Sequence, residues 1–180
     1  MPAKKKTTND RSVYAWALLR ITLGATFLWA FFDKLFGLGF ATCRNAKTDV
    51  VTTMCKASWA KGGSPTTGFL KFAAKGPFAD FYHNLAGNKL IDILFMGGLL
   101  LIGTALITGI AIRLAAITGS LLLFMMWTAA LWPANNPVLD DHIIYIIALF
   151  GIYAANDRQV WGLRNWWNKQ PISKSLSFLQ

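Results

Sequence analysis

The first apolar segment of the chain, residues 14–38, constrains the fold more than any other part of the sequence. A helix needs about 20 apolar residues to cross the hydrocarbon core of a bilayer, and this segment is long enough. It carries Arg20 near one end and Asp33 and Lys34 near the other. Charged side chains inside such a segment usually face other protein groups or water, because their transfer into lipid is unfavourable. The sequence therefore predicts a membrane-spanning helix whose charged side chains need partners elsewhere in the chain.

The composition agrees with a membrane protein. Charged residues make up 14% of the 180 residues and hydrophobic residues 54%, whereas soluble domains carry about 25% charged residues. The net charge is +10, and the basic residues lie outside the long apolar segments. This pattern indicates loops beside anionic lipid. Without a recognition motif, the positive charge does not indicate nucleic-acid binding.

Three more apolar segments predict an all-α integral membrane protein, a four-helix transmembrane bundle. The three further spans are expected at residues 90–109, 112–131 and 141–155, of which the last is the shortest. We expect the chain to comprise a disordered basic N-terminus (1–12), a transmembrane domain (13–156) and an interfacial cytoplasmic tail (157–180). Within the domain, residues 39–88 form a long extracytoplasmic loop between the first two helices.

A short amphipathic helix is predicted inside that loop, at residues 76–87. Pro77 stands at a favourable first helical position and Gly87 stands just after the end. Phe78, Phe81, Tyr82 and Leu85 recur at helical spacing. We expect this helix to lie on the outer membrane surface, as a cover over the bundle or simply packed against the membrane.

The distribution of basic residues predicts the orientation. Four spans place both termini on the same side, and Arg113 in the turn between helices 2 and 3 shares that side with the basic terminal segments. The turn at residues 132–140 contains no Lys or Arg. The loop at 39–88 is also basic, but short turns determine orientation more strongly than long segments do. We therefore expect both termini in the cytoplasm and the protein in the cytoplasmic (inner) membrane of a prokaryote.

The two cysteines, Cys43 and Cys55, both lie in the 39–88 loop. In an oxidising compartment they are suited to form a disulfide, and the alternative is two unpaired thiols. Two cysteines without nearby histidines fall short of a zinc ligand set. We favour the disulfide.

Polar and aromatic residues gather at the expected outer end of the bundle. They are Asp33, Lys34, Asp92, Trp127, Trp132, Asp140, Asp141, His142 and Tyr145. An apolar bundle with convergent acidic, basic and aromatic groups is suited to bind a small molecule. Asp141 or Asp140 would orient His142, which can transfer protons near neutral pH, and quinone chemistry needs such proton transfer. The structural alternative is that Asp140 caps a helix, Asp33 and Lys34 pair at an interface, and the tryptophans form an aromatic belt.

Arg20 and Arg113 have structural interpretations. Arg20 would bind carbonyl groups at a helix end near Gly109, or extend to the cytoplasmic headgroups. The two histidines, His83 and His142, do not form an evident bis-histidine haem site, so neither a metal nor a haem is expected.

Several short motifs, in their order along the chain, carry a resemblance to a known family. They are LLRITLG (18–24), DKL (33–35), GGSPTTGFL (62–70), GPF (76–78), GIAIRLAA (109–116), NNP (135–137) and DDHIIY (140–145). This series resembles the DoxX/DoxD family of small four-helix membrane proteins. The resemblance implies a subunit of a thiosulfate:quinone oxidoreductase that works with a DoxA-like subunit, and it highlights Arg20, Asp33, Lys34, Arg113, Asp141 and His142.

Two functional hypotheses follow. In the first, the chain is a subunit of a quinone-linked oxidoreductase with quinone as co-substrate. Asp141, His142 and Asp33 would then be catalytic, and Lys34, Asp92, Trp127, Trp132 and Tyr145 would bind substrate or quinone. In the second, the chain is a non-catalytic accessory subunit of a larger respiratory complex.

Overall fold

The computed structural model describes residues 11–134, 136–171 and 173. Regular structure in this part of the chain is helical, and β-pairing is limited to an isolated bridge between Arg44 and Val51. The four longer helices are α1 (Arg11–Phe36), α3 (Lys89–Thr108), α4 (Ile112–Ala129) and α5 (Asp141–Ala154). The shorter elements are α2 (Ala79–Leu85), α6 (Arg164–Trp167), a π-helix (Phe69–Ala73) and 3₁₀ turns at Trp59–Lys61, Gly76–Phe78 and Asn156–Arg158.

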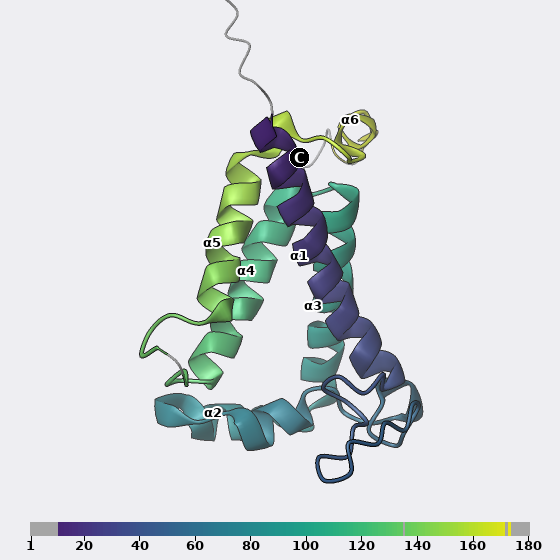
Figure 1. Ribbon diagram of the computed structural model, residues 1–180, viewed down its shortest axis with the longest axis vertical. Helices are drawn as coiled ribbons and strands as arrows, with labels where there is room; N and C mark the ends of the chain where they lie inside the picture. The colour runs from purple at the N-terminus through teal and green to yellow at the C-terminus, as the bar shows by residue number, and fades with distance from the viewer. Residues whose placement is uncertain (1–10, 135, 172, 174–180) are drawn as a thin grey trace, which may run out of the picture.

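The four longer helices surround one apolar core. Helix α1 packs against α3 and α5, and α4 packs against the same two helices (Figure 1). Met96, Leu106 and Leu149 are completely buried in this core, and Phe27 and Phe31 of α1 pack there too. The burial of one side of each helix explains why these apolar segments fold as a bundle.

Two glycines bring α1 and α3 close together. A Cβ atom on Gly24 would lie 2.9 Å from Leu106 Cβ, and one on Gly103 would lie 3.0 Å from the carbonyl oxygen of Gly24. Small residues allow this kind of close backbone approach between membrane helices. A larger residue at either position would push the two helices apart.

Within the described residues, three helices are long and apolar enough to cross a membrane: α1, α3 and α4. Helix α5 is also apolar but has only 14 residues. The sides of the bundle carry large exposed apolar side chains, among them Leu101, Leu121 and Phe150, as expected for contact with lipid. These features confirm the prediction of an all-helical protein whose longer helices are apolar enough to span a membrane.

The helix boundaries differ in places from the predicted ones. Helix α1 includes Arg11 and Ser12, which were expected in the disordered terminus, and it ends at Phe36 because Gly37 adopts a positive φ of 65°. Helix α4 ends at Ala129, two residues early. The rest of the predicted disordered segment (1–10) and the end of the predicted tail (174–180) lie outside the described residues.

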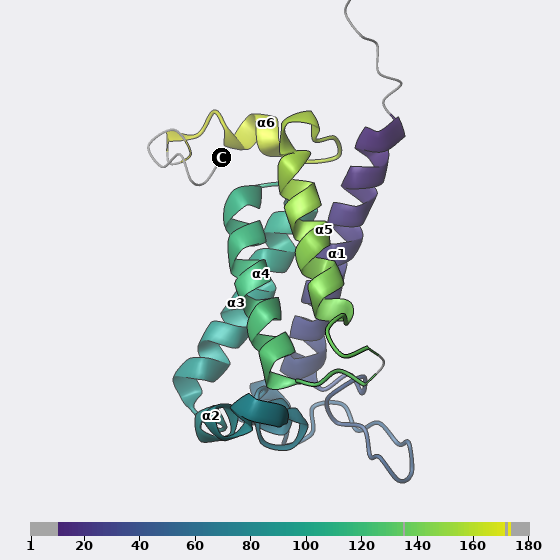
Figure 2. The ribbon, with the colours of Figure 1, turned by 90° about the vertical axis from the view of Figure 1, so that its left-hand side faces the viewer.

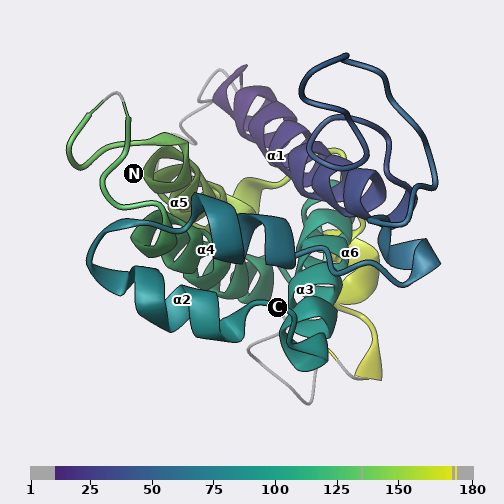
Figure 3. The same cartoon turned by 90° about the horizontal axis from the view of Figure 1, so that it is seen from below.

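The connection between α1 and α3 covers one end of the bundle. Its second half, residues 64–86, contains the π-helix and α2 and crosses beneath the end of α4 (Figure 3). We call this segment the strap. Leu70, Ala74 and Tyr82 of the strap form a second apolar cluster with Ala129 of α4. The amphipathic helix predicted at 76–87 corresponds to the 3₁₀ turn and α2, where Tyr82 is buried and Phe78 and Phe81 are exposed.

The beginning of α1, the end of α5 and α6 lie together at the end of the bundle opposite the strap (Figure 2). We call this the terminal end, and the end covered by the strap the loop end. Each expected site residue is assigned below to one of these two ends.

Candidate functional site

Asp140 and His142 form a hydrogen-bonded pair at the loop end. Asp140 is the N-cap of α5, and its Oδ1 accepts hydrogen bonds from the backbone nitrogens of His142 (3.0 Å) and Ile143 (3.3 Å). Its second oxygen, Oδ2, lies 2.7 Å from His142 Nδ1. An aspartate is a favoured N-cap because its carboxylate accepts from the free N–H groups of the first turn. The cap therefore also fixes the imidazole ring.

This geometry is suited to proton transfer. A carboxylate on Nδ1 holds the ring in the tautomer that leaves Nε2 for exchange. Among the described residues, Nε2 has no hydrogen-bond partner. The two side chains are partly buried, with 22% of His142 and 19% of Asp140 exposed. A partly exposed imidazole at a helix end can take a proton from water and deliver it to a bound molecule.

Asp141 and Asp140 were both predicted as possible partners of the imidazole, and the structure places Asp140 there. Asp141 was the one included in the predicted catalytic set. Asp141 is exposed and follows the cap within the first turn of α5. The extended backbone of Asp140 turns its side chain back over the helix start, and Asp141 already has helical geometry. The sequence contains two adjacent aspartates, and the capping position decides which of them reaches the ring.

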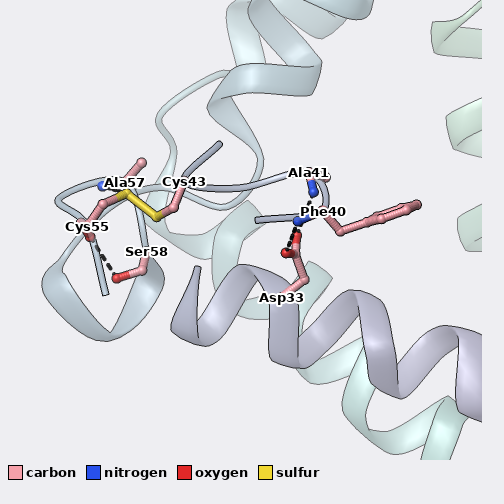
Figure 4. Close-up of a disulfide and its surroundings, with 7 residues drawn as sticks. All are labelled: Asp33, Phe40, Ala41, Cys43, Cys55, Ala57 and Ser58. Carbon is pink, nitrogen blue, oxygen red and sulfur yellow. Dashed lines mark hydrogen bonds between the residues drawn. A yellow bond between two sulfur atoms is a disulfide. The ribbon is translucent and has the colours of Figure 1, made fainter. Parts of the chain in front are cut away.

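Asp33, predicted to be catalytic, lies where the chain leaves α1. Its side chain is buried, and its two oxygens accept hydrogen bonds from Phe40 N (2.9 Å) and Ala41 N (3.0 Å), as Figure 4 shows. Backbone N–H groups that would otherwise lack partners are thus satisfied where the chain leaves α1. Asp33 therefore caps this loop, with each carboxylate oxygen accepting one backbone hydrogen bond.

Asp92, predicted to bind substrate, holds the strap to α3. Its Oδ1 accepts from Ser64 Oγ (2.8 Å), Thr66 Oγ1 (2.6 Å) and Thr66 N (3.3 Å). Asp92 and Thr66 are buried. The motif at 62–70 therefore acts in this structure as a loop anchor.

The other predicted binding residues of the loop end have varied environments. Trp127 of α4 donates its indole N–H to the carbonyl oxygen of Val138 (2.9 Å), which places this indole beside the chain that leads into Asp140. Tyr145 packs against the main core, and Trp132 is 62% exposed. Lys34 Nζ lies 5.9 Å from the centre of the Phe95 ring. Trp127 thus contacts the segment that precedes Asp140 and His142.

Cys43 and Cys55 form a disulfide, with their Cα atoms 5.8 Å apart. The bridge closes the first half of the α1–α3 connection (Figure 4). Gly37, at the end of α1, lies directly beneath it, because a Cβ atom there would overlap Cys43 Sγ. The disulfide therefore fixes the loop close to the end of α1.

Arg20 binds carbonyl groups at the terminal end. Its Nη1 donates to the carbonyl oxygens of Leu106 (2.5 Å) and Ile107 (3.1 Å), and its Nη2 donates to those of Val160 (3.2 Å) and Trp161 (2.8 Å). The first two carbonyls belong to the last turn of α3, where a cation is favourable. Arg20 thus joins α1, α3 and the segment after α5. Arg113, the second arginine with a predicted structural role, is exposed in the first turn of α4.

A pocket of about 310 Å³ lies at the terminal end, away from the predicted site. It is lined by the start of α1, the end of α5 and the turn that follows: Ser12, Val13, Trp16, Ala17, Arg20, Ile152 and Ala154–Gln159. This pocket was not among the sites predicted from the sequence. The available signal was the spacing of Val13, Trp16, Ala17 and Arg20, which places all four on one face of a helix.

In the described part of the chain, no group of three or more His, Cys, Asp or Glu side chains is placed to hold a metal ion. Comparisons with protein-family models, with curated proteins and with solved structures found no match.

Proposed function

We propose that the chain is a four-helix membrane subunit of a quinone-linked oxidoreductase, in which His142 and Asp140 transfer protons to the quinone as it is reduced. The observation that supports this proposal is the 2.7 Å hydrogen bond between His142 Nδ1 and Asp140 Oδ2 in a partly buried setting. General acid–base catalysis needs a group with a pKa near the working pH that is held in position. Histidine is the side chain whose ordinary pKa meets this condition.

In this proposal α5 is the fourth span, and the terminal end faces the cytoplasm of a prokaryotic cell. Arg113, Arg158 and Arg164 belong to turns and segments at that end, whereas Asp140 and Asp141 begin α5 at the other. Basic residues favour the cytoplasmic side of a membrane. The disulfide loop then lies outside the cytoplasm, in a compartment that permits disulfides.

Reduction of a quinone consumes two electrons and two protons. The His142–Asp140 pair supplies a proton route, and the indole of Trp127 offers an aromatic face beside it. The electron donor in this proposal is a small reduced sulfur anion such as thiosulfate. A DoxA-like or other redox subunit would pass its electrons to the quinone. This assignment follows the resemblance to the DoxX/DoxD family.

The test uses the protein in mild detergent with its native partner subunits, a water-soluble quinone and thiosulfate, and it follows the absorbance of the quinone. We expect His142→Gln to slow quinone reduction about 100-fold, within the range of general acid–base contributions. Asp140→Asn should also slow it while α5 stays capped, since asparagine is an equally good N-cap.

Asp141→Asn is the matched control, because it removes the same charge from the neighbouring, exposed position. It should leave the rate within about twofold, as expected for a surface substitution. Thiosulfate-dependent reduction that proceeds unchanged in His142→Gln would contradict the proposal.

A second function is favoured by the buried carboxylates. Asp33 and Asp92 are both engaged by loop backbone and hydroxyl groups, which suits a non-catalytic accessory subunit of a larger respiratory complex. Comigration with respiratory enzymes in a gentle-detergent native gel, together with unchanged enzyme rates in His142→Gln, would support this second function over the first.

A further inference from the structure

The pocket at the terminal end contains a buried cation without an anionic partner. Arg20 is 1% exposed, and its four hydrogen bonds all go to backbone carbonyl oxygens. Its Nε lacks a hydrogen-bond partner among the described residues. Carbonyl groups solvate the charge of a guanidinium but do not neutralise it. The wall of this pocket therefore keeps a buried positive charge.

The remaining charged residues of the pocket add to its excess of positive charge. Arg158 also lines the pocket and is exposed. The acidic lining residue is Asp157, whose side chain is 91% exposed and lies 2.8 Å from Arg164 Nη2. Because Asp157 already pairs with Arg164, the charges of Arg20 and Arg158 are left without an acidic partner in the pocket lining. The pocket therefore has a positive electrostatic potential that favours an anionic ligand.

The rest of the lining is apolar or weakly polar. Val13, Ala17 and Ile152 form an aliphatic wall between α1 and α5, and the indole of Trp16 packs against α5 at Gly151. A Cβ atom on Gly151 would lie 2.6 Å from the Trp16 ring, so this glycine makes room for the indole. Tryptophan side chains commonly lie at the level of the lipid headgroups. The pocket thus places cations and amides beside an apolar wall at the membrane surface.

We infer that this pocket binds an anionic phospholipid from the leaflet at the terminal end. The phosphate would lie at Arg20 and Arg158, within reach of the amides of Asn156 and Gln159, and an acyl chain would follow the wall between α1 and α5. Arg158 would present its fork of N–H groups to the phosphate oxygens. Arg20 would contribute its positive charge, because its Nη groups already donate to carbonyl oxygens. This site lies at the opposite end of α5 from His142 and is independent of the redox function proposed above.

Native mass spectrometry of the full chain in mild detergent tests this inference by counting bound lipids. Dioleoylphosphatidylglycerol should bind at least about fivefold more tightly than dioleoylphosphatidylcholine, as expected for about 1 kcal/mol per basic residue. Arg158→Gln should weaken the first bound phosphatidylglycerol about fivefold. Arg113→Gln is the matched control, since Arg113 is an exposed arginine at the same end outside the pocket lining, and it should leave that affinity unchanged.

Two further measurements separate the pocket from general surface attraction. Ala154→Leu adds bulk to the pocket without changing the charge and should remove the tightly bound lipid. Soluble sn-glycerol 3-phosphate should fail to displace the lipid, because it lacks the acyl chains. Equal affinity for the two lipids, equal effects of Arg158→Gln and Arg113→Gln, retention of the lipid in Ala154→Leu, or displacement by glycerol 3-phosphate would each overturn the inference.

Discussion

At the scale of single residues, three buried charged side chains, Arg20, Asp33 and Asp92, have partners other than an opposite charge. Arg20 donates to carbonyl oxygens, Asp33 accepts from amide nitrogens, and Asp92 accepts from two hydroxyls and an amide. A buried charge is tolerated when hydrogen bonds compensate its lost hydration. Each of the three therefore fixes a piece of irregular backbone against a helix.

The loop-capping role of Asp33 predicts a stability effect. Asp33→Asn replaces one acceptor oxygen with an NH₂ group, so one of the two backbone N–H groups at Phe40 and Ala41 loses its partner. An unsatisfied buried donor costs about 1–3 kcal/mol. We expect thermal unfolding in detergent to show a loss of this size, and Asp141→Asn to stay within about 0.5 kcal/mol of the parent. A loss of quinone reduction in Asp33→Asn without loss of stability would instead support the catalytic role.

At this scale the residues were predictable from the sequence, and the partners were predictable only for Arg20. The sequence indicated that charges in an apolar segment need partners, and for Arg20 these included helix-end carbonyls near Gly109. It could not place Asp33 or Asp92, because their partners are backbone N–H groups and hydroxyls whose direction depends on how the loop folds. The spacing of residues along the chain does not predict the direction of these loop groups.

At the scale of elements, the strap at residues 64–86 contains more regular structure than the sequence predicted. The helix near 76–87 was predictable from its apolar spacing, and the π-helix at Phe69–Ala73 was not. The strap is held by contacts with the last turn of α4. The Tyr82 hydroxyl lies 2.6 Å from Thr128 Oγ1, and Lys75 N donates to the carbonyl oxygen of Ala129 (2.9 Å). These contacts join segments far apart in sequence, which local patterns do not encode.

The Tyr82–Thr128 hydrogen bond predicts how firmly the strap is attached. Tyr82→Phe and Thr128→Val should each increase hydrogen exchange in α2 and lower stability by about 1 kcal/mol. Because the two hydroxyls share one bond, the double variant should cost less than the sum of the single variants. Tyr153→Phe is the matched control, an exposed tyrosine on α5. Additive effects of the two substitutions would show that the hydroxyls act independently.

At the scale of the whole molecule, the two ends of α5 have different chemistry. The loop end contains the His142–Asp140 pair, and the terminal end contains the pocket with Arg20. The helical fold class was predictable because apolar segments of sufficient length have few alternatives in lipid. The pocket was not, because it depends on how the turn after α5 folds back over α1. Its recognition required the positions of residues more than a hundred apart in sequence.

The proposed four-span topology predicts opposite labelling of the two ends. In a background with Cys43→Ser and Cys55→Ser, single cysteines introduced at Thr48 and Asp141 should react with a membrane-impermeant maleimide added outside intact cells. Cysteines at Arg113 and Arg158 should react after the cells are opened. Labelling of the Asp141 and Arg158 positions from the same side would show that α5 does not cross the membrane.

The 14 residues of α5 have a consequence for the surrounding bilayer. At 1.5 Å per residue the helix is about 21 Å long, against a hydrocarbon thickness of about 30 Å. Helix α1, with 26 residues, is long enough to cross even when tilted. For α5 to cross as well, the bilayer must become thinner on its side of the molecule. That thinning would bring water and lipid headgroups towards His142, so that a shortened helix would itself provide a path for protons to the edge of the membrane.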